Sequence, residues 1–321
     1  MKPAILLFGM PRSGTTWIAK ILDSHPDVDY RHEPDSLLPI DGVPLLPDSD
    51  DEAARAAFGR YLASVDGMHQ LRVCGKQPVF PKRWAFGRVG AALLRANLVS
   101  AKLASRAGLD LGVAPALLPS DDQGVLLWKS IESIGRMGLA ASLDAAPRCI
   151  VLLRHPCGHV ASVLQGQAKK LFSANTGPQH DEGMIRLMCE SPEGRAQGLE
   201  AAAMMAMTSE EVLAWRWRIF NDHALSRVAG RANVLVLKYE AVCADPAAEA
   251  ETMIRFAGLD WDDQCRRFVE ASSSGDSEGY YSVVKNPMQS AMKWKDSMSE
   301  DSIARVNAVV AGSAAARYYE L

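Results

Sequence analysis

The sequence lacks several features that would assign it to common protein classes. It has no run of about 20 apolar residues, so we expect no membrane span. The apolar stretch Ala4–Phe8 is too short for a signal peptide and leads directly into a glycine-containing loop. The formal net charge is only -3, which argues against a general nucleic-acid binder. We therefore expect a soluble, cytoplasmic protein that has no nucleic-acid partner.

Cysteine is also sparse, and its pattern does not indicate a disulfide framework or a metal site. The six cysteines are scattered without a C-x-x-C pair, as is typical of reduced, packed thiols. One local group, His155, Cys157 and His159, offers three potential metal ligands. Pro156 and Gly158 mark a turn between them, on which alternate residues point in different directions. We therefore predict that no metal is bound.

Strand-like and helix-like patterns alternate along the 321 residues, 48% of which are hydrophobic. Apolar runs with the character of buried strands occupy four segments, 4–8, 124–130, 148–155 and 233–240. Helical patterns occupy 156–170 and 209–228, and Asp245 with Pro246 starts another that Gly258 ends. This order predicts an α/β fold with a central parallel sheet, helices on both faces, and ligands at the carboxyl ends of the strands.

We predict that residues 1–321 form a single domain, because no repeat or linker divides the sequence. Two long helical insertions without strand patterns interrupt it, at about 35–122 and 171–207. The first contains a proline-rich loop at 37–47 and helical stretches at 52–65 and 84–107. Insertions at the binding edge of a sheet commonly form the walls or lid of a substrate pocket, although a purely structural role is an equally good interpretation.

The segment ILLFGMPRSGTTWIAKIL has the pattern of a phosphate-binding strand, loop and helix. Gly9 and Gly14 have G-x-x-x-x-G spacing, so amides of residues 12–16 can converge on an anion at the start of the helix. A magnesium-triphosphate loop has lysine after the second glycine, where this sequence has Thr15. The cation is instead Arg12, before the glycine. This favours a phosphate or phosphosulfate ligand, the alternative being an ordinary strand–turn–helix.

These motifs together resemble sulfotransferases that use 3′-phosphoadenosine 5′-phosphosulfate (PAPS). MPRSGTTW is similar to the family's 5′-phosphosulfate loop, and LLRHPCGHVAS to its 3′-phosphate motif. LKYEAVCADP and NPMQSAMKWKDSM resemble two later motifs. The resemblance implies a P-loop-like site in which the donor is held by Arg12, Ser13, Gly14, Thr15, Thr16, Arg154, Ser162 and Tyr239, with Lys285 in place of a family arginine.

The segment HPDVDYRHEPDSLLP is closest to the branch of that family that sulfates sugar hydroxyls. This resemblance implies that Glu33 is the catalytic base, with His32 as the alternative. Arg12, and Lys129 in LLWKS, would then stabilise charge on the departing nucleotide. The cytosolic branch, which sulfates phenols and steroids, has its histidine base at the position that Ile131 occupies here.

The resemblance implies in-line transfer of a sulfonate group from PAPS to a hydroxyl, without a metal, releasing adenosine 3′,5′-bisphosphate (PAP). The expected acceptor is a small molecule such as a sugar, a glycan or a carrier-bound intermediate, whose pocket or lid the two insertions form. Two alternatives stay open. One is a P-loop kinase-like nucleotide enzyme, which would depend on magnesium. The other is a non-catalytic nucleotide-binding protein of the same fold. The sequence does not indicate the oligomeric state.

Overall fold

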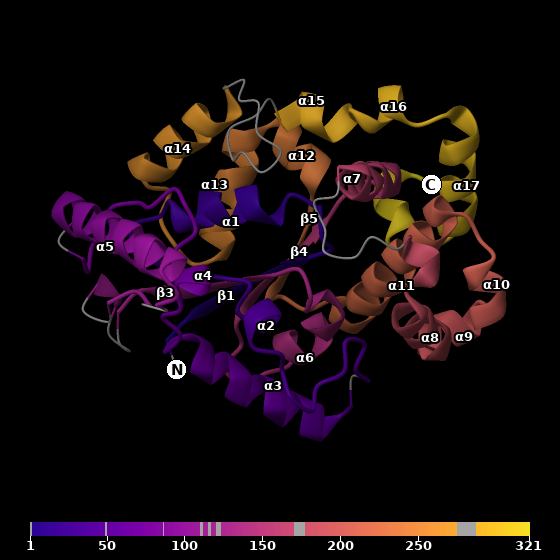
Figure 1. Cartoon of the computed structure of the whole chain (residues 1–321), viewed down its shortest axis with the longest axis horizontal. Coiled ribbons are helices and arrows are strands. Elements are labelled where there is room, and N and C mark those ends of the chain that lie inside the picture. Colours follow the sequence, from indigo (N-terminus) through magenta and orange to yellow (C-terminus); the bar gives the residue numbers. More distant parts are fainter. Residues whose placement is uncertain are drawn as a thin grey trace.

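A parallel sheet forms the centre of the molecule (Figure 1). The computed structural model describes residues 2–48, 50–85, 87–109, 112–114, 117–119, 123–169, 177–274 and 287–321. Within these ranges the sheet has five strands in the order β2-β3-β1-β4-β5. Their bounds are β1 Ala4–Gly9, β2 Val28–His32, β3 Val125–Ser130, β4 Arg148–Leu153 and β5 Val234–Lys238. The predicted α/β fold with a central parallel sheet is confirmed.

Helices cover both faces of the sheet, so side chains of alternate residues along each strand enter two separate cores. Phe8 and Trp128 belong to one core, and Leu7 and Leu127 to the other. The first core includes α3 Glu52–Val65, α6 Met137–Ala141, α7 Pro156–Ala168, α11 Ser209–Val228 and α17 Glu300–Val310. The second includes α1 Thr15–Asp23, α13 Pro246–Phe256 and α14 Asp263–Ser273. Burial on both faces explains why β1, β3 and β4 read as nearly continuous apolar runs.

The chain turns to opposite faces of the sheet after the neighbouring strands β1 and β4. The turn after β1 leads into α1 in the second core, whereas the turn after β4 leads into α7 in the first. Such a divergence creates a crevice at the carboxyl edge of a parallel sheet. Both turns therefore lie at the carboxyl edge of the sheet, where the sequence predicts ligands.

Helices α3 and α11 have the bounds that the sequence predicts, whereas α5 Arg88–Arg106 does not. The predicted start at Trp84 is wrong, because Gly87, with φ 57°, breaks the backbone before the helix. α7 ends at Ala168, and Lys170 lies outside the described residues. Asp245 caps α13, accepting a hydrogen bond from the amide of Ala248 at 3.1 Å.

The remaining elements are short, and the longest of them, α8, has nine residues. The first insertion adds α2 Pro34–Leu37 and α4 Leu71–Cys74. The second adds η3 Pro178–His180, α8 Glu182–Glu190, α9 Pro192–Ala196 and α10 Ala201–Met205. Elsewhere lie η2 Ile134–Arg136, α12 Tyr239–Ala244, α15 Pro287–Met292, α16 Trp294–Ser297 and η4 Ala316–Tyr319. None of the helices in the described ranges is long and apolar enough to cross a membrane. The single-domain assignment stays a prediction.

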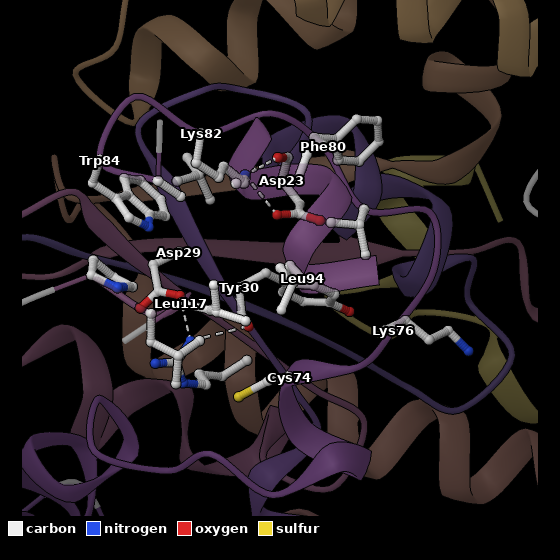
Figure 2. Close-up of a pocket in the computed structure, with 18 of the residues that line it drawn as sticks. Asp23, Asp29, Tyr30, Cys74, Lys76, Phe80, Lys82, Trp84, Leu94 and Leu117 are labelled. Atoms are coloured by element: carbon white, nitrogen blue, oxygen red, sulfur yellow. Dashed lines mark hydrogen bonds and ion pairs between the residues drawn. The ribbon is translucent and has the colours of Figure 1, made fainter. Parts of the chain in front are cut away.

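A buried charge cluster fixes the segment after α4 against α1, around a cavity of about 50 Å³ (Figure 2). The Lys82 amine donates hydrogen bonds to the Asp23 carboxylate at 2.9 Å and to the carbonyl of His25 at 3.1 Å. Lys20 also pairs with Asp23, whose pKa stays below its ordinary value although burial opposes this, because both lysines favour the carboxylate. Figure 2 shows the Lys76 amine directed away from this cluster.

Candidate functional site

A large open cavity of about 1600 Å³ runs along the carboxyl edge of the sheet. It is lined from the β1–α1 loop, the ends of β2 and β3, the α7 and α12 helices, and the α15–α16 segment. It brings together the predicted residues Arg12, Gly14, Thr15, Thr16, His32, Glu33, Lys129, Arg154, Ser162 and Tyr239. Ser13 does not line it and is only 1% exposed. Lys285 lies outside the described residues.

The β1–α1 loop has a backbone shape that its glycine makes possible. Arg12 and Gly14 both adopt left-handed conformations, with φ of 71° and 90°. A Cβ atom at Gly14 would lie 2.3 Å from Cε2 of Tyr239, so the tyrosine ring packs directly on the loop. Left-handed backbone at a residue other than glycine is uncommon and is concentrated at functional sites. Arg12 is thus held in a conformation that the surrounding structure must stabilise.

Thr15 and Thr16 form the first turn of α1, and Trp17 is the first residue whose amide bonds back into the helix. The amides of a first helical turn have no intrahelical acceptor, and they lie at the positive end of the helix dipole. This end of α1 opens on the cavity and is suited to an anion. The amide of Ser13 instead donates to the carbonyl of Met10 at 3.1 Å and closes the turn.

Arg154 joins the β4–α7 turn to the β1–α1 loop. Its guanidinium donates to the carbonyl of Arg12 at 2.6 Å and to that of Ser290 at 3.2 Å. The same group lies over the Tyr239 ring, 5.1 Å from its centroid. Its Nε is buried and has no hydrogen-bond partner among the described residues. Ser162 Oγ lies 3.4 Å from Arg12 Nε, so the two predicted phosphate motifs meet.

Trp294 lies against the turn that carries Arg154. Its indole stacks on His155, with ring centroids 4.4 Å apart and an angle of 14° between the planes. A Cβ at Gly158 would lie 3.2 Å from Trp294 Cδ1, so only glycine allows this approach without displacement. Burial, with the charges of Lys295 and Arg154, lowers the pKa of His155 to about 4. His155 is therefore a neutral packing residue here.

Among the described residues, no group of three His, Cys, Asp or Glu side chains is arranged to hold a metal ion. The sequence also predicts that the reaction needs no metal, and this stays a prediction.

Glu33 and Lys129 form an ion pair at the ends of β2 and β3. Lys129 is only 1% exposed, and its amine donates a hydrogen bond to Glu33 Oε1. The Glu33 amide donates to the carbonyl of Lys129 at 2.8 Å, which extends the pairing of the two strands. Glu33 also has left-handed backbone, with φ of 48°, immediately before Pro34. The carboxylate is thus positioned by the sheet and by a strained turn.

The two candidate bases differ in charge at neutral pH. Burial alone would raise the pKa of Glu33, but the charge and hydrogen bond of Lys129 outweigh it, and the pKa is lowered. Glu33 is therefore a carboxylate. Burial and the Lys129 charge lower the pKa of His32 to about 3, so its ring is neutral. His32 Nδ1 lies 2.7 Å from the hydroxyl oxygen of Tyr30.

Three residues that the sequence did not single out complete this end of the cavity. Asp35 is buried and accepts hydrogen bonds from the hydroxyls of Ser130 and, at 2.6 Å, Ser133. These bonds fix α2, and hence the adjacent Glu33 turn, on the strand that carries Lys129. Arg72 and Lys76, in and after α4, line the cavity beyond β2. No motif pointed to them, because only tertiary packing brings the first insertion to this edge.

Comparison with known proteins places the chain in a family. The model of the Sulfotransferase family matches residues 3–263. The chain belongs to the sulfotransferase family. The resemblance drawn from the motifs is thereby confirmed at the level of the family, and so is sulfonate transfer as the general activity. Similarity to the sugar branch, and to the late motif around Trp294, stays a prediction. No curated protein sequence matches the chain significantly.

Several solved sulfotransferases have similar structures. The sulfotransferase domain of the curacin biosynthetic pathway is 14% identical, with 96% of this chain and 97% of that chain covered and a TM-score of 0.46. The sulfotransferase domain of the Synechococcus PCC 7002 olefin synthase is 16% identical, with 95% and 94% covered and a TM-score of 0.39. A mouse sulfotransferase complexed with PAP is 10% identical, with 100% and 89% covered and a TM-score of 0.43.

Proposed function

We propose that the protein transfers the sulfonate group of PAPS to a hydroxyl group of an acceptor and releases PAP. The observation that carries the proposal is the order of groups along one cavity. The Arg154–Ser162 pair, the anion-suited loop and the Glu33–Lys129 pair follow one another from β4 through β1 to β3 and β2. Such an arrangement provides two sites for the phosphates at the two ends of the donor nucleotide and, beside them, a site for the attacking alcohol.

In this proposal the 3′-phosphate of the donor lies on Arg154 and Ser162. Arginine forms charge-assisted hydrogen bonds with phosphate, and Arg154 Nε is buried without a partner among the described residues. The 5′-phosphosulfate lies on Arg12 and the first-turn amides of Thr15 and Thr16. Ser13 and Tyr239 act indirectly, because Ser13 closes the loop and Tyr239 packs against it. Lys285 contributes a further positive charge near the 3′-phosphate in this proposal.

The reaction forms a bond between the acceptor oxygen and sulfur, and breaks the bond between sulfur and the oxygen of the nucleotide phosphate. The hydroxyl proton passes to the Glu33 carboxylate, which is ionised at neutral pH. The departing PAP retains the negative charge, which Arg12 and Lys129 stabilise. Protonation of Glu33 removes the charge partner of Lys129, so the buried ammonium becomes available to the leaving oxygen as the proton moves.

The acceptor enters on the β2 side, where Arg72, Lys76 and Ile131 line the cavity. The Glu-Pro sequence at Glu33 favours a sugar or another small alcohol, free or attached to a glycan or a carrier. Both insertions supply walls or a lid in this proposal, and the protein acts in the cytoplasm. No metal takes part, since the cations and helix-end amides neutralise the departing nucleotide.

Calorimetric titration with PAP tests the proposal, with ADP and ATP as controls and with and without magnesium. We expect micromolar binding of PAP that does not need magnesium. Arg154→Ala should weaken it by about 10- to 100-fold, the value of a lost charge-assisted hydrogen bond. Arg266→Ala, at an exposed position of α14, is the matched control and should leave the affinity unchanged. Preferential binding of ATP with magnesium would instead support a kinase, and tight PAP binding without turnover a non-catalytic protein.

A further inference from the structure

Helix α5 has an exposed apolar face. Five of the eight large hydrophobic side chains that are exposed in the described residues come from the segment 89–109. Four are on the helix itself: Val89 is 65% exposed, Leu93 54%, Val99 59% and Leu103 58%. The pairs Val89–Leu93 and Val99–Leu103 each have i,i+4 spacing, which places their members on one side of a helix. With 3.6 residues per turn, these four side chains lie within an arc of about 120° of the helix surface, and we call them the apolar row. Isolated apolar side chains are normal on protein surfaces, but several on one side of a helix indicate a binding surface.

The opposite face of α5 is firmly packed, so the exposed row is a regular feature of the folded protein. Gly90, Ala91, Leu98 and Ala101 are buried. Leu98 belongs to a small core with Val79 and Val113, contributed by other parts of the first insertion. Arg95 donates a hydrogen bond to the carbonyl of Val79 at 2.9 Å, which further fixes the helix. The row therefore has a defined orientation and remains uncovered by the described chain.

The charge of α5 indicates what covers this face. The helix contains Arg88, Arg95, Lys102 and Arg106 and no acidic residue, although the whole protein carries a net charge of -3. An apolar row beside basic side chains is the composition of helices that lie in the interface of an anionic membrane. A second copy of this helix would bring like charges together. Figure 1 shows α5 at the left end of the molecule, at the opposite end from α17.

We propose that α5 docks the protein peripherally on membranes that contain anionic lipids, with Val89, Leu93, Val99 and Leu103 entering the headgroup region. The basic side chains then contact lipid phosphates from the edge of the helix. Binding is reversible, because one interfacial helix inserts only its apolar side chains. This inference is independent of the proposed reaction.

Co-sedimentation of the full chain with vesicles tests the proposal. One set contains phosphatidylcholine and phosphatidylglycerol, and the other phosphatidylcholine alone. We expect binding to the anionic vesicles that weakens as salt is raised. The triple variant Leu93→Glu/Val99→Glu/Leu103→Glu should bind at least about 100-fold more weakly, because it loses apolar contacts and adds negative charge. Its exposed positions should leave PAP affinity and the melting temperature unchanged.

A second variant separates charge from apolar contact. Arg88→Gln/Lys102→Gln/Arg106→Gln should also lose binding, by about 100-fold at low salt. Arg255→Gln/Arg266→Gln/Arg267→Gln, which removes three exposed charges from α13 and α14, is its matched control and should bind as wild type does. Failure of the wild-type chain to sediment with anionic vesicles would overturn the proposal, as would unchanged binding by the apolar triple variant. A dimer in solution that this triple variant dissociates would assign the face to a second copy instead.

Discussion

The two ends of the cavity are built in different ways. At the β1–β4 end, backbone shape dominates: Gly14 accommodates the Tyr239 ring, and Arg154 bonds to the carbonyl of Arg12. At the β2–β3 end, a buried ion pair between Glu33 and Lys129 dominates. A site formed from backbone can bind a constant ligand in a fixed position. A site formed from a coupled carboxylate and ammonium can move a proton and respond to charge. This division matches a constant donor and a reacting acceptor.

The largest expected effect is at the β2–β3 end. Glu33→Gln should lower the turnover number by about 10²- to 10⁴-fold, because it removes the proposed proton acceptor. PAP affinity should change less than about threefold, since Glu33 lies outside the donor contacts. Release of PAP from PAPS in the presence of a panel of monosaccharides measures the first quantity, and calorimetry the second. Loss of PAP affinity in this variant would contradict the division of the cavity.

Glu33→Gln also leaves Lys129 buried without its charge partner, which costs about 3–5 kcal/mol in such pairs. The double variant Glu33→Gln/Lys129→Met removes both charges and should recover much of that stability without recovering activity. His32→Gln is the matched control and should retain most of the activity. If His32→Gln were the inactive variant, the base would be His32.

At the β1–β4 end the corresponding change is Gly14→Ala. The new Cβ would meet the Tyr239 ring at 2.3 Å in a backbone with φ of 90°, so the loop must move. We expect PAP affinity to fall by about 100-fold, because a small displacement separates the loop amides from the phosphate. Gly42→Ala is a matched control, with φ of 72° and open space around it, and should leave the affinity unchanged. Equal loss in both variants would show that the lower affinity does not arise from the contact between residue 14 and the Tyr239 ring.

The same contrast explains what could be predicted from sequence. The loop from Gly9 to Thr16 and the Arg154 turn are short consecutive patterns, and each lies next to a strand that local apolarity identifies. Asp35 and Lys76 belong to no such local sequence pattern. Their roles arise only when the first insertion packs beside β2 and β3. Trp84 shows the opposite error. The predicted helix begins at this residue, but Trp84 lies before α5 and lines the small cavity between α1 and the segment after α4.

The smallest expected effect is shared by the two ends, and it concerns acid stability. His159, beneath the β1–α1 loop, has its pKa lowered to about 3 by burial and by the charges of Arg154, Arg216 and Arg12. The pKa of His32, at the other end, is also lowered to about 3. Between pH 6.5 and 3 the unfolded chain therefore binds protons at these histidines that the folded chain does not. Stability contributed by the neutral rings is complete above pH 6.5 and falls as the pH decreases.

Each of these histidines should cost about 2 kcal/mol of the free energy of unfolding at pH 5 relative to pH 7.5. His159→Gln and His32→Gln should each reduce the pH dependence by that amount, measured by urea unfolding at pH 7.5, 6 and 5. His180→Gln, which changes a histidine outside both cores, should not alter it. A wild-type pH dependence in His159→Gln would show that this ring is protonated in the folded protein. The charges of Arg154 and Arg12 would then not lower the pKa of His159. Acid would in that case reduce the free energy of unfolding through His32, at the end with the ion pair, and not through His159 at the β1–β4 end.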